Sequence, residues 1–89
     1  MHVTMHLSNA IRQRIIELMK DMNFADLSKV SDVRYTTLIS FMNGKNKTIT
    51  LNILYNLCTG LKINLYDFFN CYLFDNIIDE HEKNLKVKQ

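Results

Sequence analysis

The chain has 89 residues, of which 47% are apolar and 22% charged, with two Gly and no Pro. This length predicts a single domain, and the scarcity of Gly and Pro favours regular helix over a loop-rich or disordered chain. The formal net charge of +2 is too small to indicate a nucleic-acid partner by itself. However, residues 1–50 carry a net charge of +3 and residues 51–89 a net charge of −1, so the basic excess lies in the first half.

The sequence shows no sign of membrane insertion or export. Its apolar runs are only a few residues long, whereas a membrane-spanning helix needs about 20 apolar residues. The first six residues lack the features of a signal peptide. We therefore expect a cytoplasmic protein with no membrane association. Cys58 and Cys71 could form one disulfide, but cytoplasmic thiols stay reduced, so we interpret both as small apolar residues.

The spacing of apolar residues predicts five helices and an all-α fold. In chain order the predicted helices cover approximately residues 8–21, 24–30, 34–43, 51–60 and 65–80. Ser8 is a suitable cap for the first helix. A tight turn at Ser31-Asp32 joins the second and third, and Asn43-Gly44 ends the third, where a left-handed residue closes a helix.

The second half of the chain carries clear helix boundaries. Thr50 and Asn64 are suitable caps for the fourth and fifth helices, and Gly60 stops the fourth. The alternating residues 48–53 are also compatible with a strand, but no partner strand is evident elsewhere. The predicted organisation is a flexible N-terminus over 1–7, a domain over 8–70, an apolar helical extension over 71–80 and a polar tail over 81–89.

One ordered series of residues resembles a known family. Residues 27–45 read Leu-Ser-Lys-Val-Ser-Asp-Val-Arg-Tyr-Thr-Thr-Leu-Ile-Ser-Phe-Met-Asn-Gly-Lys, and the pattern continues without a gap through Gly60-Leu61 to the pair Phe68-Phe69. This series resembles the helix-turn-helix of the lambda-repressor-like (Cro and Xre type) DNA-binding family, and the likeness covers about residues 8–70. Asp32 stands where the family commonly has a turn Gly, so the turn must either avoid a positive φ or accept it in Asp at modest cost.

The resemblance implies that the helix over residues 34–43 lies in the major groove of double-stranded DNA. Its outward side chains include no acid and form the predicted base-reading set: Arg34, Tyr35, Thr36, Thr37 and Ser40. Arg34 could pair with a guanine or with a phosphate. The loop that follows is the predicted phosphate-binding set: Asn43, Lys45, Asn46, Lys47, Thr48 and Thr50. Arg12 and Arg14 on the first helix are weaker phosphate candidates.

The implied function is a sequence-specific transcriptional regulator, a repressor of bacterial or mobile-element origin. We expect no catalytic residue and no cofactor. His2 and His6 have a spacing that would suit a metal, but they lack a third ligand, so we predict no metal site. The alternative is a protein-interaction module on the same fold, with the apolar C-terminal helix as its working surface.

We also expect a homodimer, because one helix-turn-helix reads only a few base pairs and regulators of this type pair across a two-fold axis. The predicted dimer contacts are Tyr72, Phe74, Ile77 and Ile78. The other reading of this apolar segment is that it folds back over its own core. The sequence does not identify a regulatory protein partner.

Overall fold

A computed structural model of the chain describes residues 4–78. The helices in this range are α1 (Leu7–Met19), α2 (Phe24–Ser31), α3 (Tyr35–Met42), α4 (Leu51–Gly60) and α5 (Leu65–Phe69), followed by a 3₁₀ turn, η1 (Tyr72–Phe74). Two short strands, β1 (Thr4–His6) and β2 (Asn76–Ile78), lie at the two ends of the described chain. The predicted all-α class with five helices is confirmed, and the two short strands are an addition that was not predicted.

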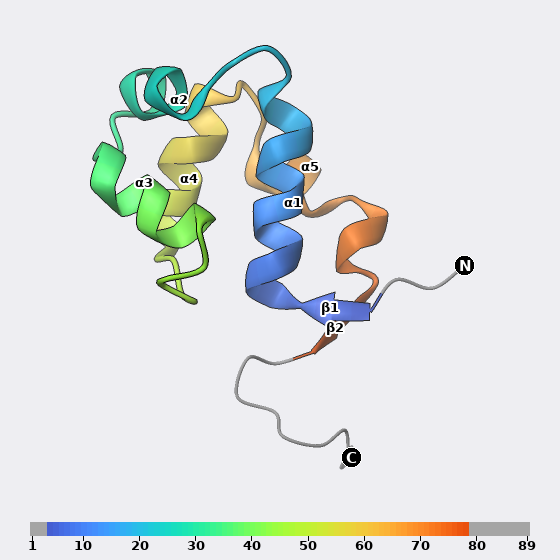
Figure 1. Cartoon of the computed structure of the whole chain (residues 1–89). Helices are drawn as coiled ribbons and strands as arrows, with labels where there is room; N and C mark the ends of the chain where they lie inside the picture. The colour runs from blue at the N-terminus through green and yellow to red at the C-terminus, as the bar shows by residue number, and fades with distance from the viewer. Residues whose placement is uncertain (1–3, 79–89) are drawn as a thin grey trace.

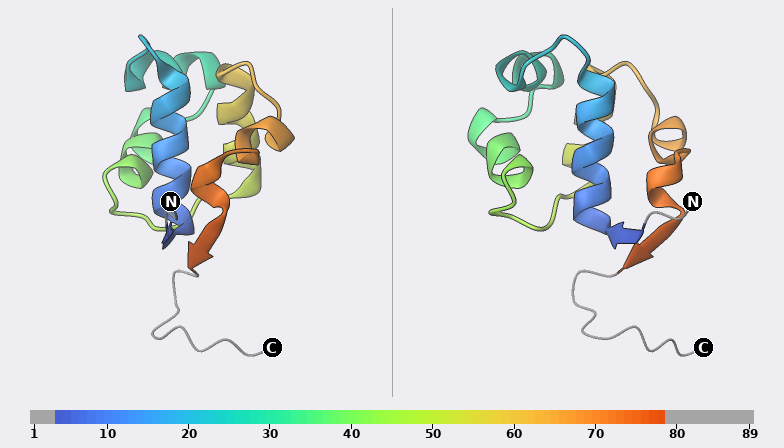
Figure 2. Two further views of the ribbon diagram at one scale, coloured as in Figure 1. Left: turned by 90° about the vertical axis from the view of Figure 1, so that its right-hand side faces the viewer. Right: turned by 45° about the vertical axis from the view of Figure 1, so that its right-hand side comes forward.

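Helix α1 is the central element of the fold. In Figure 1 and in the right view of Figure 2, α2 and α3 lie on one side of α1, and α5 and η1 lie on the other. Each helix turns an apolar stripe inward, as the predicted periodicity requires. The fully buried side chains at the centre are Ile15, Leu27, Leu38, Leu57, Cys58 and Phe68. Helices α1, α2, α3 and α4 all contribute side chains to this core, and this packing holds α3 in place against the other three.

Both cysteines are free thiols. Cys58 is buried in the core, and this burial raises the pKa of its thiol. The interpretation of Cys58 as a small apolar residue is therefore supported. Cys71 is different because it is only partly buried, with its Sγ 4.0 Å from Oε1 of Glu17.

Two of the predicted helix caps are confirmed and one is wrong. Oγ1 of Thr50 accepts a hydrogen bond from the amide of Ile53, and Oδ1 of Asn64 accepts one from Asp67. Ser8 does not cap α1: the helix begins one residue earlier, His6 is its N-cap, and Ser8 is buried in the first turn. The physical reason is that β1 ends at His6 and leads directly into the helix.

Gly60 was predicted to stop α4, but it does not adopt the left-handed conformation that ends the helix. The left-handed residue is Lys62, with φ 63°. Its amide bonds to the carbonyl of Thr59, and the amide of Ile63 bonds to that of Cys58. These are the two hydrogen bonds of a Schellman motif, in which glycine usually occupies the left-handed position. Here Gly60 lies two residues earlier, inside the helix.

We expect Lys62→Gly to raise the free energy of unfolding by about 0.5–1 kcal/mol, because glycine adopts a positive φ without the steric cost that Lys62 bears. Chemical denaturation followed by circular dichroism measures the change. In the matched variant Lys29→Gly, in the last turn of α2, the free energy of unfolding should instead fall by about 1 kcal/mol. An equal loss in both variants would contradict the assignment of strain to Lys62.

The predicted extended C-terminal helix is wrong. Helix α5 ends at Phe69, and Cys71 adopts an extended backbone with φ −157° and ψ 145°. This change of direction buries Leu73 and packs the ring of Phe74 against Phe69, with centroids 4.9 Å apart. Leu73 and Phe74, whose spacing helped to predict a helix to residue 80, therefore serve core and aromatic packing instead.

A parallel pair of strands replaces the last part of the predicted helix. Thr4 pairs with Asn76, and His6 with Ile78. The β-branched residues Ile77 and Ile78 suit a strand, and β1 is the partner strand of β2. Residues 4–6 are thus not a flexible N-terminus, and residues 51–53 of the considered strand belong to α4. Residues 1–3, residues 79–80 of the predicted extension and the predicted tail over 81–89 lie outside the described residues.

Candidate nucleic-acid interface

The turn between α2 and α3 sets the direction of α3. Asp32 adopts the left-handed conformation with φ 59° and ψ 35°, so aspartate accepts the positive φ that glycine would adopt more easily. Val33 is buried in the turn, and its carbonyl accepts a hydrogen bond of 2.5 Å from Oγ of Ser28. The predicted pair of short helices joined by a tight turn is confirmed, with boundaries within about one residue of those expected.

The structure divides the predicted base-reading set into two groups. Arg34, Tyr35 and Thr36 are exposed at the N-terminal end of α3, and Tyr35 exposes 49% of its surface. Arg34 is the N-cap but gives no side-chain cap bond, and its guanidinium has no hydrogen bond or ion pair within residues 4–78. Thr37 and Ser40 are half-buried. Arg34, Tyr35 and Thr36 are therefore the most exposed side chains of the set.

The loop after α3 folds back onto that helix. Gly44 has φ 86°, which a left-handed helix end requires, and Oδ1 of Asn43 accepts a hydrogen bond from the amide of Lys45. The amide of Asn46 bonds to the carbonyl of Ser40 at 2.9 Å. The predicted phosphate-binding side chains are all exposed: Asn43, Lys45, Asn46, Lys47, Thr48 and Thr50. The hydroxyl of Thr50 is already used as the cap of α4. Thr50 also lies beside the backbone amides of the first turn of α4, which have no partner within the helix.

A hollow of about 200 Å³ separates α3 from this loop. Thr37 lines it from α3, and Asn46, Thr48 and Thr50 line it from the loop. Its apolar floor includes Phe41. Thr37 of the predicted base-reading set and three residues of the predicted phosphate-binding set therefore border one hollow between α3 and the loop.

Arg12 and Arg14, the weaker phosphate candidates, both donate hydrogen bonds to backbone carbonyls of the protein itself. Arg12 donates hydrogen bonds from Nε to the carbonyl of Phe41 at 2.6 Å and from Nη2 to the carbonyl of Asn46 at 3.1 Å. Its Nη1 donates to Oδ1 of Asn9. Both partner carbonyls belong to the end of α3 and the loop, and they lie 29 and 34 residues away in sequence.

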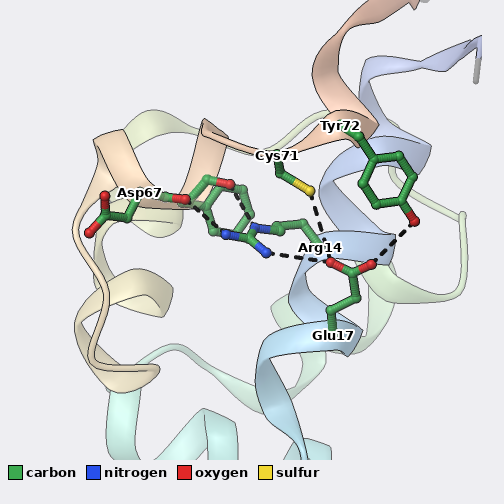
Figure 3. A network of polar contacts seen from close by, with 6 residues as sticks. Arg14, Glu17, Asp67, Cys71 and Tyr72 are labelled. Atoms are coloured by element: carbon green, nitrogen blue, oxygen red, sulfur yellow. Dashed lines mark hydrogen bonds and ion pairs between the residues drawn. The ribbon is translucent and has the colours of Figure 1, made fainter. Parts of the chain in front are cut away.

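Arg14 makes an equivalent connection on the other side of α1 (Figure 3). Its Nε and Nη2 donate to the carbonyls of Phe68 and Asp67, both at 2.8 Å. Its Nη1 also lies 3.4 Å from Oε1 of Glu17, whose other oxygen is 3.5 Å from the hydroxyl of Tyr72. Arg14 and Glu17 therefore attach α5 and the segment after it to α1.

The N-terminus of α2 is capped from within the chain. Oδ1 of Asn23 accepts a hydrogen bond from the amide of Asp26, and the Asp26 carboxylate accepts one from the amide of Asn23. This is a capping box, and the spacing Asn-x-x-Asp in the sequence could have revealed it. The carboxylate of Asp26 therefore lies at the positive end of the helix dipole.

The predicted dimer contacts occupy different environments. Tyr72 exposes 58% of its surface and Ile77 exposes 37%. Ile78 is half-buried in β2. The ring of Phe74 packs against the rings of Phe68 and Phe69, so this half-buried side chain contacts the protein's own core.

No group of three or more His, Cys, Asp or Glu side chains between residues 4 and 78 could hold a metal ion. Within the same residues, no helix is long and apolar enough to span a bilayer.

A comparison with protein-family models matches residues 13–72 to the Cro/C1-type HTH DNA-binding domain. Because this match covers about two thirds of the 89 residues, the chain belongs to that family and contains a DNA-binding helix-turn-helix. The resemblance found in the sequence is thereby confirmed. Neither the curated proteins nor the solved structures contain a match to the chain. The family match begins within α1 and ends at Tyr72, so β1 and β2 lie outside it.

Proposed function

We propose that this protein is a sequence-specific transcriptional regulator that reads the major groove of double-stranded DNA with α3. The observation that carries the proposal is the set of exposed cationic side chains on α3 and the following loop. Arg34 stands at the start of α3 and Lys45 and Lys47 lie in the loop, and all three side chains are exposed. The guanidinium of Arg34 and the ammonium groups of Lys45 and Lys47 have no hydrogen bond or ion pair in the part of the chain that the structure describes. Cationic groups without internal partners are suited to phosphate and base-edge contacts.

Within this proposal the residues of the interface have distinct roles. Tyr35 and Thr36 contact base edges, and Arg34 contacts either a guanine or a phosphate. Thr37 and Ser40 form a second row behind them. The loop binds phosphates, helped by the amides at the N-terminus of α4. The N-terminus of α2 contributes little, because the carboxylate of Asp26 repels phosphate there.

We propose that the protein acts as a repressor. A protein bound to its operator can block transcription by its presence alone, and the interface described above is sufficient for such binding. A bacterial or mobile-element origin is the source that the resemblance favours. Selection from a random pool of duplex DNA at low salt tests the proposal. We expect an enriched inverted repeat whose half-sites are about one helical turn (~34 Å) apart. Failure to enrich any motif would contradict sequence-specific binding and favour the protein-interaction module.

We further propose that the regulator is a homodimer. Tyr72 and Ile77 are the contacts that we propose first, because both are exposed, whereas Phe74 and Ile78 are half-buried. A dimer places one reading helix on each half-site, and linking two binding events raises the affinity for the whole operator.

We expect Ile77→Lys to convert the dimer into a monomer at tens of micromolar in sedimentation velocity. The variant should bind the full operator about 100-fold more weakly, while its affinity for a single half-site stays unchanged. Ile16→Lys is the matched control, because Ile16 is also exposed (54%) but lies on α1. A wild-type protein that sediments as a monomer would refute the dimer proposal.

A further inference from the structure

The guanidinium of Arg12 is held at four points. Two of them are the backbone carbonyls of Phe41 and Asn46, and the third is the side chain of Asn9. In addition, Cζ of Arg12 lies 4.8 Å from the centroid of the Phe41 ring, a distance at which a cation is attracted to an aromatic face. The side chain is thereby fixed between α1 and the end of α3.

The two carbonyls belong to the parts of the chain that the proposed function assigns to DNA. The Phe41 carbonyl lies in the last turn of α3 and also accepts a hydrogen bond from Gly44. The positive charge of Arg12 there complements the negative end of the helix dipole. Asn46 stands between Lys45 and Lys47, so a contact to its carbonyl restrains the backbone that carries both lysines.

We propose that Arg12 is a positioning residue for DNA binding: it fixes the phosphate-binding loop against α1 before DNA arrives and makes no phosphate contact itself. This inference rests on the proposed function. Ordering a loop on binding costs conformational entropy, and a loop that is already ordered avoids that cost. Arg12 therefore raises the affinity for DNA through the geometry of Lys45 and Lys47.

Arg14 provides a matched control on the same helix. The two arginines are two positions apart, which places them on roughly opposite faces of α1. Both donate to a pair of backbone carbonyls, but those reached by Arg14 belong to α5, away from the interface. Arg12→Met and Arg14→Met remove the same charge and the same kind of brace. Arg12→Met releases the end of α3 and the following loop from α1, whereas Arg14→Met releases α5 from α1.

The test measures the affinity of the full chain for the selected operator as a function of salt concentration, at a temperature where circular dichroism shows each variant to be folded. We expect Arg12→Met to weaken binding about tenfold per protomer, with the slope of log K against log salt unchanged. Arg14→Met should lower the midpoint of thermal unfolding but leave the dissociation constant within about twofold of the wild type. Arg12→Lys should recover only a small part of the lost affinity, because one ammonium cannot reproduce the planar fork of donors.

Three results would overturn the inference. A slope reduced by about 0.9 per protomer in Arg12→Met would show a direct phosphate contact. Equal affinities for Arg12→Met and Arg14→Met would show that Arg12 only stabilises the fold, and full recovery by Arg12→Lys would show that its charge alone matters. Hydrogen exchange of the Asn46 amide in the free protein gives a second readout, which should accelerate only in Arg12→Met. Because it needs no DNA, it separates failure of this inference from failure of the proposed function.

Discussion

Replacing Tyr35, Thr36 and Ser40 together by alanine is expected to abolish sequence-specific DNA binding and to leave the fold intact. We propose these three as base-reading residues because of the resemblance to the Cro and Xre type family. Each lost base contact costs about 1–3 kcal/mol, so the triple variant should bind its operator on the order of 10³-fold more weakly. The residual affinity should equal that for unrelated DNA, because the phosphate-binding loop is unchanged.

The fold should tolerate the triple substitution. Tyr35 and Thr36 are exposed and Ser40 is half-buried, and none of the three belongs to the core. Alanine is also favoured inside a helix. Anisotropy titrations with operator and scrambled DNA, together with thermal unfolding, give both readouts. Tyr66→Ala is the control, because Tyr66 is 76% exposed on α5 and should leave both readouts unchanged. Retention of operator preference in the triple variant would exclude α3 as the reading helix.

The substitution Gly60→Ala is expected to destabilise the protein by about 1–3 kcal/mol. A Cβ at Gly60 would lie 2.9 Å from Cβ of Ser31 and 3.0 Å from its Cα and amide nitrogen. Two of these atoms belong to the backbone of α2, so the contact cannot be relieved by turning a side chain, and overpacking of this kind costs 1–3 kcal/mol. Helix propensity alone predicts the opposite sign, a gain of about 1 kcal/mol from glycine to alanine.

Asn56→Ala is the control for this experiment, because Asn56 is exposed on the same helix and only propensity acts there. Its stability in urea should be equal to or slightly above that of the wild type. Gly60→Ala should unfold at a clearly lower urea concentration. If Gly60→Ala were as stable as Asn56→Ala, the close contact between Gly60 of α4 and Ser31 of α2 would be disproved.

The elements that sequence reasoning predicted well are those determined by neighbouring residues. The limits of α2 and α3, the left-handed Gly44 and the cap of α4 by Thr50 all depend on interactions within four residues. The helix-turn-helix was recognisable for the same reason, since residues 27–45 form one contiguous run. The exposed side chains of the interface follow directly from the helical period of α3.

The features that sequence reasoning missed depend on residues far apart in the chain. Arg14 has the same local context as any exposed helical arginine, and its partners Asp67 and Phe68 lie more than 50 residues away. Residues 76–78 carry an apolar pattern that suits a helix or a strand, and only the presence of β1 beside them decides for a strand. Gly60 looks like a helix stop until the close contact with Ser31 is known.

The sequence by itself determined the helical class, the position of the helix-turn-helix and the basic, acid-free surface of α3 and its loop. Those properties depend on local backbone preferences and on the period of apolar side chains. Only the tertiary structure decided that Phe74 packs against the core, that the two ends of the described chain pair as strands, and that Arg12 braces the loop that we expect to contact DNA. Each of these is a contact between distant segments, and its free energy depends on a geometry that no local pattern specifies.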